Sequence, residues 1–398
     1  MNHLLSNRIN ALEVSQTLAM AAKVRELRSQ GKDIISLSLG EPDFNTPDFI
    51  KDSAIEAIHQ NYNFYTPVEG YLELKEAICK KFKRDNNLDY KPSQIVVSTG
   101  AKQSLYNLTQ VLINPGDECI LPAPYWVSYS EMVKMAGGIP VEVPTTVETD
   151  FKITPTQLEA AITDKTKLIL FNSPCNPSGS IYTREDITAI AQVLEKYPNI
   201  LVVSDEIYEH INFAGNFCSF AAVEGMYDKT ITVNGVSKAF AMTGWRIGYI
   251  GAPEYIAKAC AKMQGQVTSG TNSIAQRATI SAVSADPKVL SEMVAEFHKR
   301  RDIVIKMLKE IPNIKINNPE GAFYAFPDVS WYIGKTLNNT KINTVDDLVM
   351  YILEEANVAT VTGAAFGNSN CIRLSYATSE DLLIEALTRM QKAFAKVK

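Results

Sequence analysis

The stretch TITVNGVSKAFAMTGWR, residues 230–246, indicates the fold of this chain because a strand-like run leads directly into a polar segment. Residues 230–234 are short, mostly apolar and rich in β-branched side chains, which is typical of a strand buried on both faces of a mostly parallel sheet. Lys238 then stands among small and apolar residues. Desolvation there would lower the pKa of its amine, as a Schiff-base lysine requires. Ser237 and Arg246 flank it and are suited to binding phosphate.

Four further runs of this kind precede it, at residues 94–98, 118–121, 167–171 and 200–204. Helical stretches, such as residues 156–162 and 183–197, lie between them. This alternation predicts a doubly wound α/β domain. The last third predicts a smaller α+β unit: a helix over 287–310, a strand over 321–326, a helix over 345–357, strands over 358–361 and 371–376, and a final helix. We expect residues up to 39 to pack with this unit, because a short helix and strand make a poor domain alone.

Composition excludes several classes of protein. The net charge of -5 argues against a nucleic-acid or anionic-membrane surface. No apolar run reaches the roughly 18 residues of a membrane span, and the first ten residues lack the apolar core of a secretory signal. The six cysteines form no CxxC pair and the four histidines show no metal-ligand spacing. We therefore expect a cytoplasmic enzyme with reduced thiols and without a metal site.

Ligands of open α/β sheets bind beyond the carboxyl ends of the strands, so the residues after each strand are candidates for the site. Gly100 follows the first run and opens a helix whose N-terminus could bind an anion, although such turns are often only turns. Trp126 follows the second run and could stack on a flat ring or belong to the core. Asn176 follows the third and offers an amide donor or a plain Asn-Pro turn. Asp205 follows the fourth; its buried carboxylate needs a cationic partner, unless it only caps a helix or forms a salt bridge.

Together these motifs resemble the fold-type I, class I/II aminotransferases, which depend on pyridoxal 5'-phosphate (PLP). The resemblance rests on Asn-Pro-x-Gly at residues 176–179, Asp-x-x-Tyr at 205–208 and Ser-Lys-x5-Gly-Trp-Arg at 237–246, in this order. It runs from residues 39–43 to 373–375 and is strongest to the Ib-type bacterial aspartate aminotransferases, a branch that also contains prephenate aminotransferases. It implies a large PLP-binding domain, with a mostly parallel seven-stranded sheet between helices, and a smaller α+β domain built from the N- and C-terminal segments. The implied limits are 1–47 for the N-terminal arm and part of the small domain, 48–285 for the large domain and 286–398 for the small C-terminal domain.

The resemblance also implies a role for each site residue. Lys238 would form the Schiff base with PLP and carry the proton, and Asp205 would hold the pyridine nitrogen protonated. Asn176 and Tyr208 would donate to the ring oxygen O3', and Trp126 would stack on the ring. The phosphate would be bound by Gly100, Ala101, Lys102, Ser237 and Arg246. Arg373 and the backbone of Gly40 would bind the substrate α-carboxylate.

Two implied features concern the second subunit and the substrate. Tyr65 matches a tyrosine that reaches the phosphate of the neighbouring subunit, which implies a homodimer with active sites at the interface. The segment 262–276, where animal and enteric aspartate enzymes present an arginine to the distal carboxylate, contains none. Lys102 occupies the place where the Ib branch presents a lysine instead, and Thr17 with Lys102 matches a pair associated with prephenate.

We therefore expect amino transfer from an acidic amino acid, foremost L-aspartate, to 2-oxoglutarate by a ping-pong mechanism that gives oxaloacetate and L-glutamate. Its partners would be small amino acids and 2-oxo acids. Prephenate or aromatic amino acids are alternative substrates of the same site. A PLP-dependent C–S lyase, an aminocyclopropane-carboxylate synthase and a non-catalytic PLP-binding regulatory protein are further alternatives. A nicotinamide-dependent enzyme is disfavoured because no GxGxxG follows any predicted strand.

Overall fold

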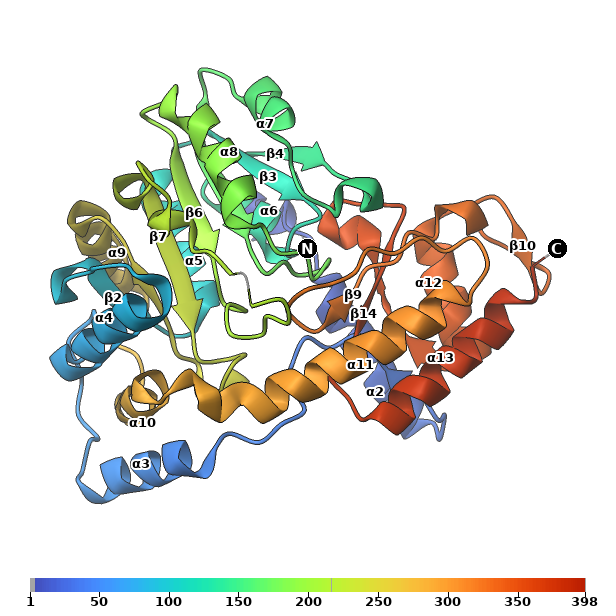
Figure 1. Ribbon diagram of the computed structural model, residues 1–398, viewed down its shortest axis with the longest axis horizontal. Helices are drawn as coiled ribbons and strands as arrows, with labels where there is room; N and C mark the ends of the chain where they lie inside the picture. The colour runs from blue at the N-terminus through green and yellow to red at the C-terminus, as the bar shows by residue number, and fades with distance from the viewer. Residues whose placement is uncertain (1–3, 216, 398) are drawn as a thin grey trace.

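A computed structural model describes residues 4–215 and 217–397. Its main sheet has seven strands in the order β2-β8-β7-β6-β5-β3-β4 (Figure 1). The strands are β2 (Ile95–Ser98), β3 (Glu118–Ala123), β4 (Ile139–Pro144), β5 (Thr166–Asn172), β6 (Leu201–Asp205), β7 (Thr230–Gly235) and β8 (Gly248–Gly251). β8 pairs antiparallel with β2 and β7, and the other pairs are parallel. The predicted fold class is confirmed.

Alternate residues of the central strands pack on opposite faces of this sheet. In β5, Leu168 and Leu170 join the hydrophobic cluster formed with α5 (Ala101–Leu112), α6 (Ser128–Met135) and α9 (Glu254–Val267). Ile169 and Phe171 join the cluster formed with α7 (Pro155–Ala161) and α8 (Arg184–Glu195). Burial of both faces explains why these strands are apolar nearly throughout.

Three further helices complete the cover at the β2 end of the sheet. They are α3 (Asp48–His59), α4 (Leu72–Asn86) and α10 (Ser273–Ser284), and they share a core with Ile95 and Val97 of β2. Helices therefore pack against both faces of the parallel strands and against the β2 end of the sheet. Residues at the carboxyl ends of these strands are positioned by this framework.

The first and last parts of the chain pack together, as expected. β1 (Ile35–Ser36), which follows α2 (Gln16–Ser29), pairs in parallel with β12 (Val358–Ala359). β13 (Val361–Thr362), β14 (Ile372–Ser375) and β9 (Tyr324–Ala325) form a three-stranded antiparallel sheet. α11 (Ser291–Lys309) runs from beneath the main sheet to α12 (Val345–Ala356) and α13 (Glu380–Phe394) (Figure 1). The domain limits 1–47, 48–285 and 286–398 stay a prediction.

Two predicted elements need correction, and two strands were not predicted. The helix expected over residues 287–310 begins with a 3-10 turn, Pro287–Leu290, before α11, and the strand expected over 321–326 is only two residues long, Tyr324–Ala325. The strands β4 and β8 were not predicted. β4 is a partly exposed edge strand that contains two prolines, and β8 has four residues of which two are glycine, so neither carries a strong strand signal.

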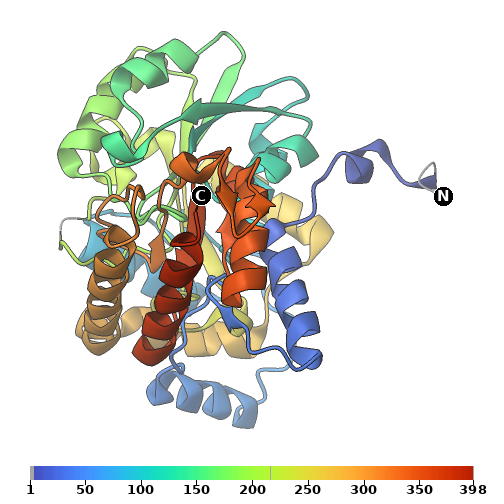
Figure 2. The same cartoon turned by 90° about the vertical axis from the view of Figure 1, so that its right-hand side faces the viewer.

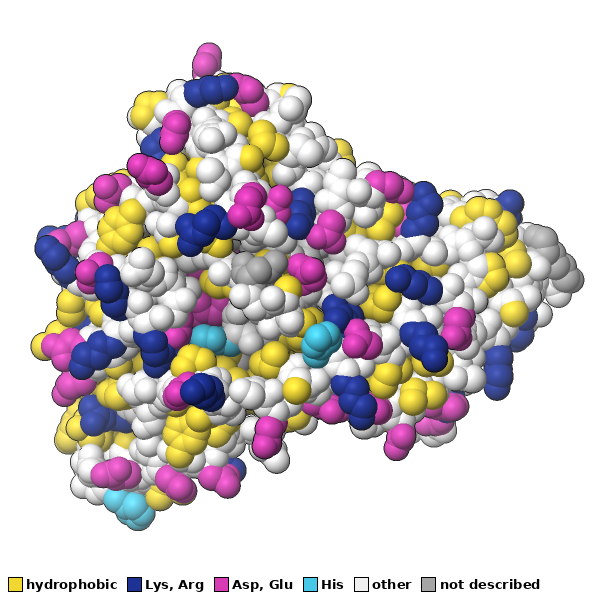
Figure 3. All heavy atoms as spheres, in the orientation of Figure 1, with side chains coloured by type: hydrophobic (Ala, Val, Ile, Leu, Met, Phe, Trp, Pro, Cys, Tyr) yellow, Lys and Arg dark blue, Asp and Glu magenta, His cyan; other side chains and the backbone are white. Residues whose placement is uncertain are grey.

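Four general features of the molecule concern its surface charge, membrane-spanning potential, thiols and N-terminal segment. Positive and negative side chains are interspersed over the face shown in Figure 3. No helix among the described residues is long and apolar enough to cross a membrane. All six cysteines are free thiols. The segment with the short helix α1 (Asn7–Asn10) projects away from the body of the molecule (Figure 2).

Candidate active site

A cavity of about 350 Å³ lies where the carboxyl ends of the central strands meet β9 and β14. All of the predicted site residues except Gly100 and Tyr65 line it. They are Thr17, Gly40, Ala101, Lys102, Trp126, Asn176, Asp205, Tyr208, Ser237, Lys238, Arg246 and Arg373. Residues separated by up to 356 positions are thus brought together at one edge of the sheet, in keeping with the strand-end rule.

Lys238 lies in the turn that follows β7. Its Nζ donates a hydrogen bond to the carbonyl oxygen of Gly40 at 2.6 Å. Burial lowers the pKa of Lys238 to about 8, assisted by the charges of Arg373 and Arg246 and opposed by the carboxylates of Glu41 and Asp205. A fraction of this amine is therefore uncharged near neutral pH and able to act as a nucleophile or a base.

Asp205 is the last residue of β6, and 4% of its surface is exposed. Its Oδ2 accepts a hydrogen bond from the Tyr129 hydroxyl at 2.7 Å, and its Oδ1 accepts one from the Ile207 amide at 3.3 Å. Burial raises the pKa of Asp205 to about 6, against the opposing effect of these donors and of Lys238. Asp205 is thus ionised at neutral pH and suited to pair with a cation inside the cavity.

Tyr129 was not predicted from the sequence. It lies in α6, three residues after Trp126, and the two rings meet edge to face with centroids 5.6 Å apart. This spacing, which places two residues on the same side of a turn, is the signal that could have found it.

Tyr208 and Tyr324 form a second unforeseen pair. Their hydroxyls lie 2.8 Å apart, and Tyr324 comes from β9 in the other part of the fold. A Cβ atom at Gly40 would overlap the Tyr324 hydroxyl, so the glycine permits this close approach. Burial raises the pKa of Tyr208 well above its ordinary value, which keeps its hydroxyl protonated.

Arg373 extends from β14 into the cavity, and 2% of its surface is exposed. Its Nη1 donates to Oδ1 of Asn176 at 3.1 Å, and its Nη2 donates to the carbonyl oxygen of Ser38 at 2.6 Å. Its buried Nε has no hydrogen-bond partner among the described residues. Burial lowers the pKa of Arg373, but a guanidinium remains charged in a protein. The side chain is therefore a buried cation suited to binding a carboxylate.

A further unpredicted residue, Asn172 at the end of β5, holds two strand ends together. Its Oδ1 accepts from the amide of Asn176 at 2.8 Å, and its Nδ2 donates to the carbonyl oxygen of Asp205 at 2.8 Å. It follows the run predicted at residues 167–171, but its contacts with Asn176 and Asp205 could not be read from the sequence. Asn172 fixes the position of Asn176 relative to β6.

The start of α5 forms an anion-binding corner. Gly100, with a φ of 81°, precedes the helix, and a Cβ atom there would overlap the Arg246 guanidinium. The amides of Ala101 and Lys102 lie in the first turn, where a helix leaves its N–H groups without intrahelical acceptors. Arg246, whose Nη1 donates to the carbonyl oxygen of Thr243 at 2.9 Å, adds a positive charge. A dianionic group such as a phosphate fits this corner.

The mouth of the cavity carries Lys102, Trp126 and Thr17. Nζ of Lys102 lies 4.7 Å from the centre of the Trp126 ring. Burial, with the nearby charge of Arg246, lowers the pKa of Lys102. Tyr65 lies outside the cavity and is fully exposed.

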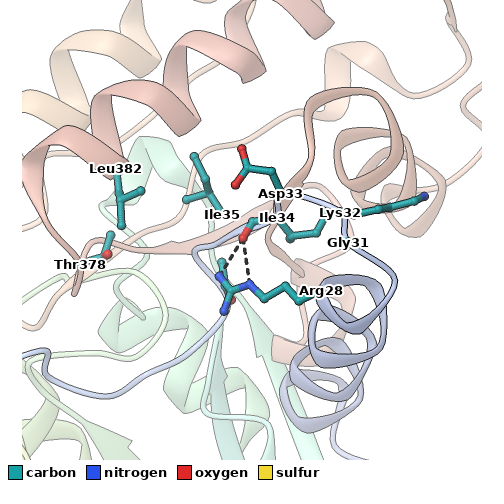
Figure 4. Close-up of a pocket in the computed structure, with 9 residues that line it drawn as sticks. Arg28, Gly31, Lys32, Asp33, Ile34, Ile35, Thr378 and Leu382 are labelled. Atoms are coloured by element: carbon teal, nitrogen blue, oxygen red, sulfur yellow. Dashed lines mark hydrogen bonds between the residues drawn. The ribbon is translucent and has the colours of Figure 1, made fainter.

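A second hollow, of about 440 Å³, is formed by other residues near α2, β1 and the start of α13. Figure 4 shows the Arg28 side chain in it, donating from Nε and Nη2 to the carbonyl oxygen of Ile34 at 3.1 and 2.7 Å. Because the backbone already engages this guanidinium, the hollow offers less binding chemistry than the cavity around Lys238.

Comparisons with known proteins agree with this geometry. The family model described as aminotransferase class I and II matches residues 32–390. The chain is 49% identical over 390 residues to an aspartate/prephenate aminotransferase of Cereibacter sphaeroides, covering 97% of this chain and 98% of the relative. It superposes on the aspartate aminotransferase of Rhizobium meliloti with a TM-score of 0.96 at 43% identity, covering 99% of each chain. It superposes on that of Thermus thermophilus with maleate with a TM-score of 0.92 at 41% identity, covering 98% and 99%. The resemblance found in the motifs is confirmed, and the chain belongs to the class I and II aminotransferases.

Proposed function

We propose that this aminotransferase uses PLP, held in the cavity around Lys238, to move an amino group from L-aspartate to 2-oxoglutarate. The observation that carries the proposal is the convergence of four features: the lysine of lowered pKa, the buried carboxylate of Asp205, the anion-binding corner and the buried Arg373. Each feature has a counterpart in the reaction. A non-catalytic PLP-binding protein would have no need for all four.

The residues present fit PLP. The phosphate fits the corner formed by the start of α5 with Ser237 and Arg246, where the glycine leaves room beside the guanidinium. A protonated pyridine nitrogen would offset the cost of burying Asp205. Trp126 offers a ring face, and Asn176 and Tyr208 offer polar hydrogens in the same cavity. When bound, PLP supplies an aldehyde that condenses with amines and a ring that accepts electrons.

The side chains of this chain then perform the remaining work. Arg373 binds the α-carboxylate of the amino acid and orients its Cα–H bond towards Lys238. Nζ of Lys238, once neutral, accepts the proton from Cα and returns it on the product side. Asp205 stays ionised at working pH and holds its cationic partner in place. The same steps in reverse pass the amino group to the 2-oxo acid.

The choice of a dicarboxylic substrate rests on Lys102. Its Nζ stands at the cavity mouth near Trp126, where it can pair with a distal carboxylate. The Thermus thermophilus relative was solved with maleate, a dicarboxylate, which supports a dicarboxylic substrate. Prephenate is the second candidate, favoured by Thr17, which lines the cavity together with Lys102, and by the name of the Cereibacter sphaeroides relative.

Replacement of the lysine tests the assignment of Lys238. We expect Lys238→Ala to lose the covalent PLP–lysine adduct, measured by mass spectrometry after borohydride reduction, together with nearly all amino transfer. Full activity in this variant would refute the assignment. Formation of pyruvate or ammonia in place of glutamate by the wild-type protein would indicate a lyase instead.

A panel of amino donors tests the role of Lys102. With 2-oxoglutarate as acceptor, Lys102→Ala should reduce kcat/KM for aspartate by about 10- to 100-fold, the loss expected for one charge-assisted pair, and reduce it far less for neutral donors. Arogenate in the panel would reveal the prephenate branch. The control is Lys134→Ala, which removes an α6 lysine paired with Glu131 outside the cavity. An equal loss for all donors would contradict a role in specificity.

We also propose a cytoplasmic homodimer. Tyr65 is fully exposed and Phe64 beside it is 79% exposed, which is unusual for aromatic residues unless a partner covers them. The projecting segment around α1 exposes Leu4 and Leu5 (Figure 2). Sedimentation equilibrium should give twice the mass of one chain, and a monomer would overturn the proposal. Six free thiols are in keeping with a reducing compartment.

A further inference from the structure

A buried charge network lies on the far side of the loop that carries Asp205 and Tyr208. Its centre is Glu209, the residue directly after Tyr208, whose side chain is 3% exposed. Glu209 Oε2 accepts from Nδ2 of Asn86 at 2.7 Å, and Oε1 accepts from Nδ2 of Asn234 at 2.8 Å. Oε1 also forms an ion pair with Nζ of Lys81, which is equally buried.

These partners come from two different elements that flank the loop. Lys81 and Asn86 belong to α4, whereas Asn234 belongs to β7 and precedes Lys238 by four residues. Nζ of Lys81 donates to Oδ1 of Asn86 at 2.9 Å, and Oδ1 of Asn234 accepts from the Gly235 amide at 2.7 Å. One carboxylate therefore connects a helix, the loop after β6 and the strand that leads to Lys238.

The positive charge in this network is that of Lys81. Ligand atoms of Asp85, Glu209 and His210 lie within 4.8 Å of one another, a spacing that suits a metal ion. Nζ of Lys81, however, contacts Glu209 and lies 3.7 Å from Asp85, so an ammonium already occupies the role of the cation. Burial opposes ionisation of Glu209, but the charges of Lys81 and His210 and the surrounding donors hold its pKa at about 2.

The loop that carries Tyr208 and Glu209 is a tight turn, so these two residues cannot move independently of each other. The amide of Glu209 donates to the Glu206 carbonyl at 3.0 Å, and the amide of Ile211 donates to the Tyr208 carbonyl at 2.8 Å. Tyr208 lines the cavity, while the adjacent Glu209 side chain enters the network. A shift of Glu209 therefore moves Tyr208.

We propose that Glu209, through its ion pair with Lys81, is a positioning residue that holds Tyr208 and Asp205 in place relative to Lys238. The proposal rests on the proposed function of these three residues, and no role in proton transfer is assigned to Glu209. A buried ion pair is costly to desolvate and adds little stability over an apolar pair, but it fixes geometry when every hydrogen bond is made. The contacts of Glu209 with both Asn86 and Asn234 meet that condition.

The test compares Lys81→Met, Glu209→Gln and the double variant with Lys152→Met. Lys152 is the matched control because it also bridges two carboxylates, those of Asp150 and Asp186, but lies away from the cavity. The double variant leaves no unpaired buried charge and therefore folds even if a single variant does not. Each purified full-length protein is studied with PLP bound.

Two readouts separate positioning from stability. The first is the pH midpoint of the absorbance change of PLP bound to Lys238; we expect it to rise by about half a pH unit or more, because a displaced Tyr208 donates less well to the ring oxygen. The second is amide hydrogen exchange, which we expect to accelerate in residues 205–213 and 234–238 before other buried segments. We also expect kcat to fall about tenfold while KM for the amino donor changes much less.

The outcomes decide the proposal. A shifted midpoint with local loss of protection in the double variant, absent in Lys152→Met, supports it. An unchanged midpoint, or faster exchange spread evenly over the chain, overturns it and leaves Glu209 with a structural role only. If the wild-type protein transfers no amino group, the proposed function fails, whereas the exchange experiment still reports whether the network holds the loop.

Discussion

The replacement Glu206→Gln should change how the stability of this protein depends on pH. Glu206 is 1% exposed and adjacent to Asp205. Its Oε1 accepts hydrogen bonds from the hydroxyls of Ser204 and Ser219 at 2.8 and 2.9 Å, while its Oε2 has no partner among the described residues. Burial, with the nearby charge of Glu209, raises the pKa of Glu206 to about 8. The folded protein therefore carries a neutral Glu206 at neutral pH.

The magnitude follows from the two protonation states. An unfolded glutamate has a pKa of about 4.3, so between pH 5.5 and 7.5 the folded state holds one proton that the unfolded state has released. The contribution of Glu206 to the free energy of unfolding then falls by about 1.4 kcal/mol per pH unit, or about 2.7 kcal/mol over this window, and levels off above pH 8. Glutamine does not titrate. The stability of Glu206→Gln relative to the wild type should therefore increase by about 2.7 kcal/mol from pH 5.5 to pH 7.5.

Equilibrium urea unfolding at fixed protein and PLP concentrations measures this difference. Because the comparison is made between two pH values, changes in hydrogen bonding that do not depend on pH cancel. Amino transfer by Glu206→Gln should stay within about threefold of the wild type, whereas Asp205→Asn should lose most of it. If the stability difference is the same at both pH values, Glu206 is ionised in the folded protein and the reasoning from its burial is wrong.

Three other replacements address the site. Tyr129→Phe removes a donor to Asp205, which should raise the pKa of that carboxyl by about one to two units and move the acid limb of the kcat/KM profile upward by a similar amount. Gly248→Ala places a Cβ atom against the Ala101 amide and should weaken PLP binding at least about tenfold, measured by fluorescence titration. Arg373→Lys removes the bidentate fork and should raise KM for all amino donors by about 10- to 100-fold, measured by steady-state kinetics, with a selective effect on dicarboxylates contradicting its role.

The sequence predicts the central sheet well because β3, β5, β6 and β7 are buried on both faces and are apolar for that reason. It predicts the edges poorly. The partly exposed β4 needs no apolar pattern, and in β8 Gly248 allows the close approach of the anion-binding corner, since a Cβ atom there would overlap Gly100 and Ala101. Such glycines allow backbone segments to pack closely, and their positions leave no periodic hydrophobic pattern in the sequence.

Site residues were predictable to the extent that they follow a strand in the sequence. Asp205 and Lys238 do, and each was found by that rule before any resemblance was considered. Tyr324 and Glu209 could not be found in this way, because their importance arises from contacts over long sequence separations. Tyr324 meets Tyr208 across 116 positions, and Glu209 meets Asn86 across 123. A single sequence contains no measure of such proximity.

The two sides of the cavity are therefore formed by different parts of the chain. Its floor is formed by Asp205 and Lys238 at the ends of a rigid sheet, and this is the part suited to a cofactor that every substrate shares. Arg373, which comes from the three-stranded sheet, and Thr17, from α2, line the opposite side. A substitution at Thr17 can alter which amino acid is accepted while the pKa values of Asp205 and Lys238 stay near 6 and 8, because burial is the main cause of both and Thr17 adds no charge to either, whereas Arg373 itself helps to lower the pKa of Lys238. Specificity can thus change independently of the chemistry in this fold.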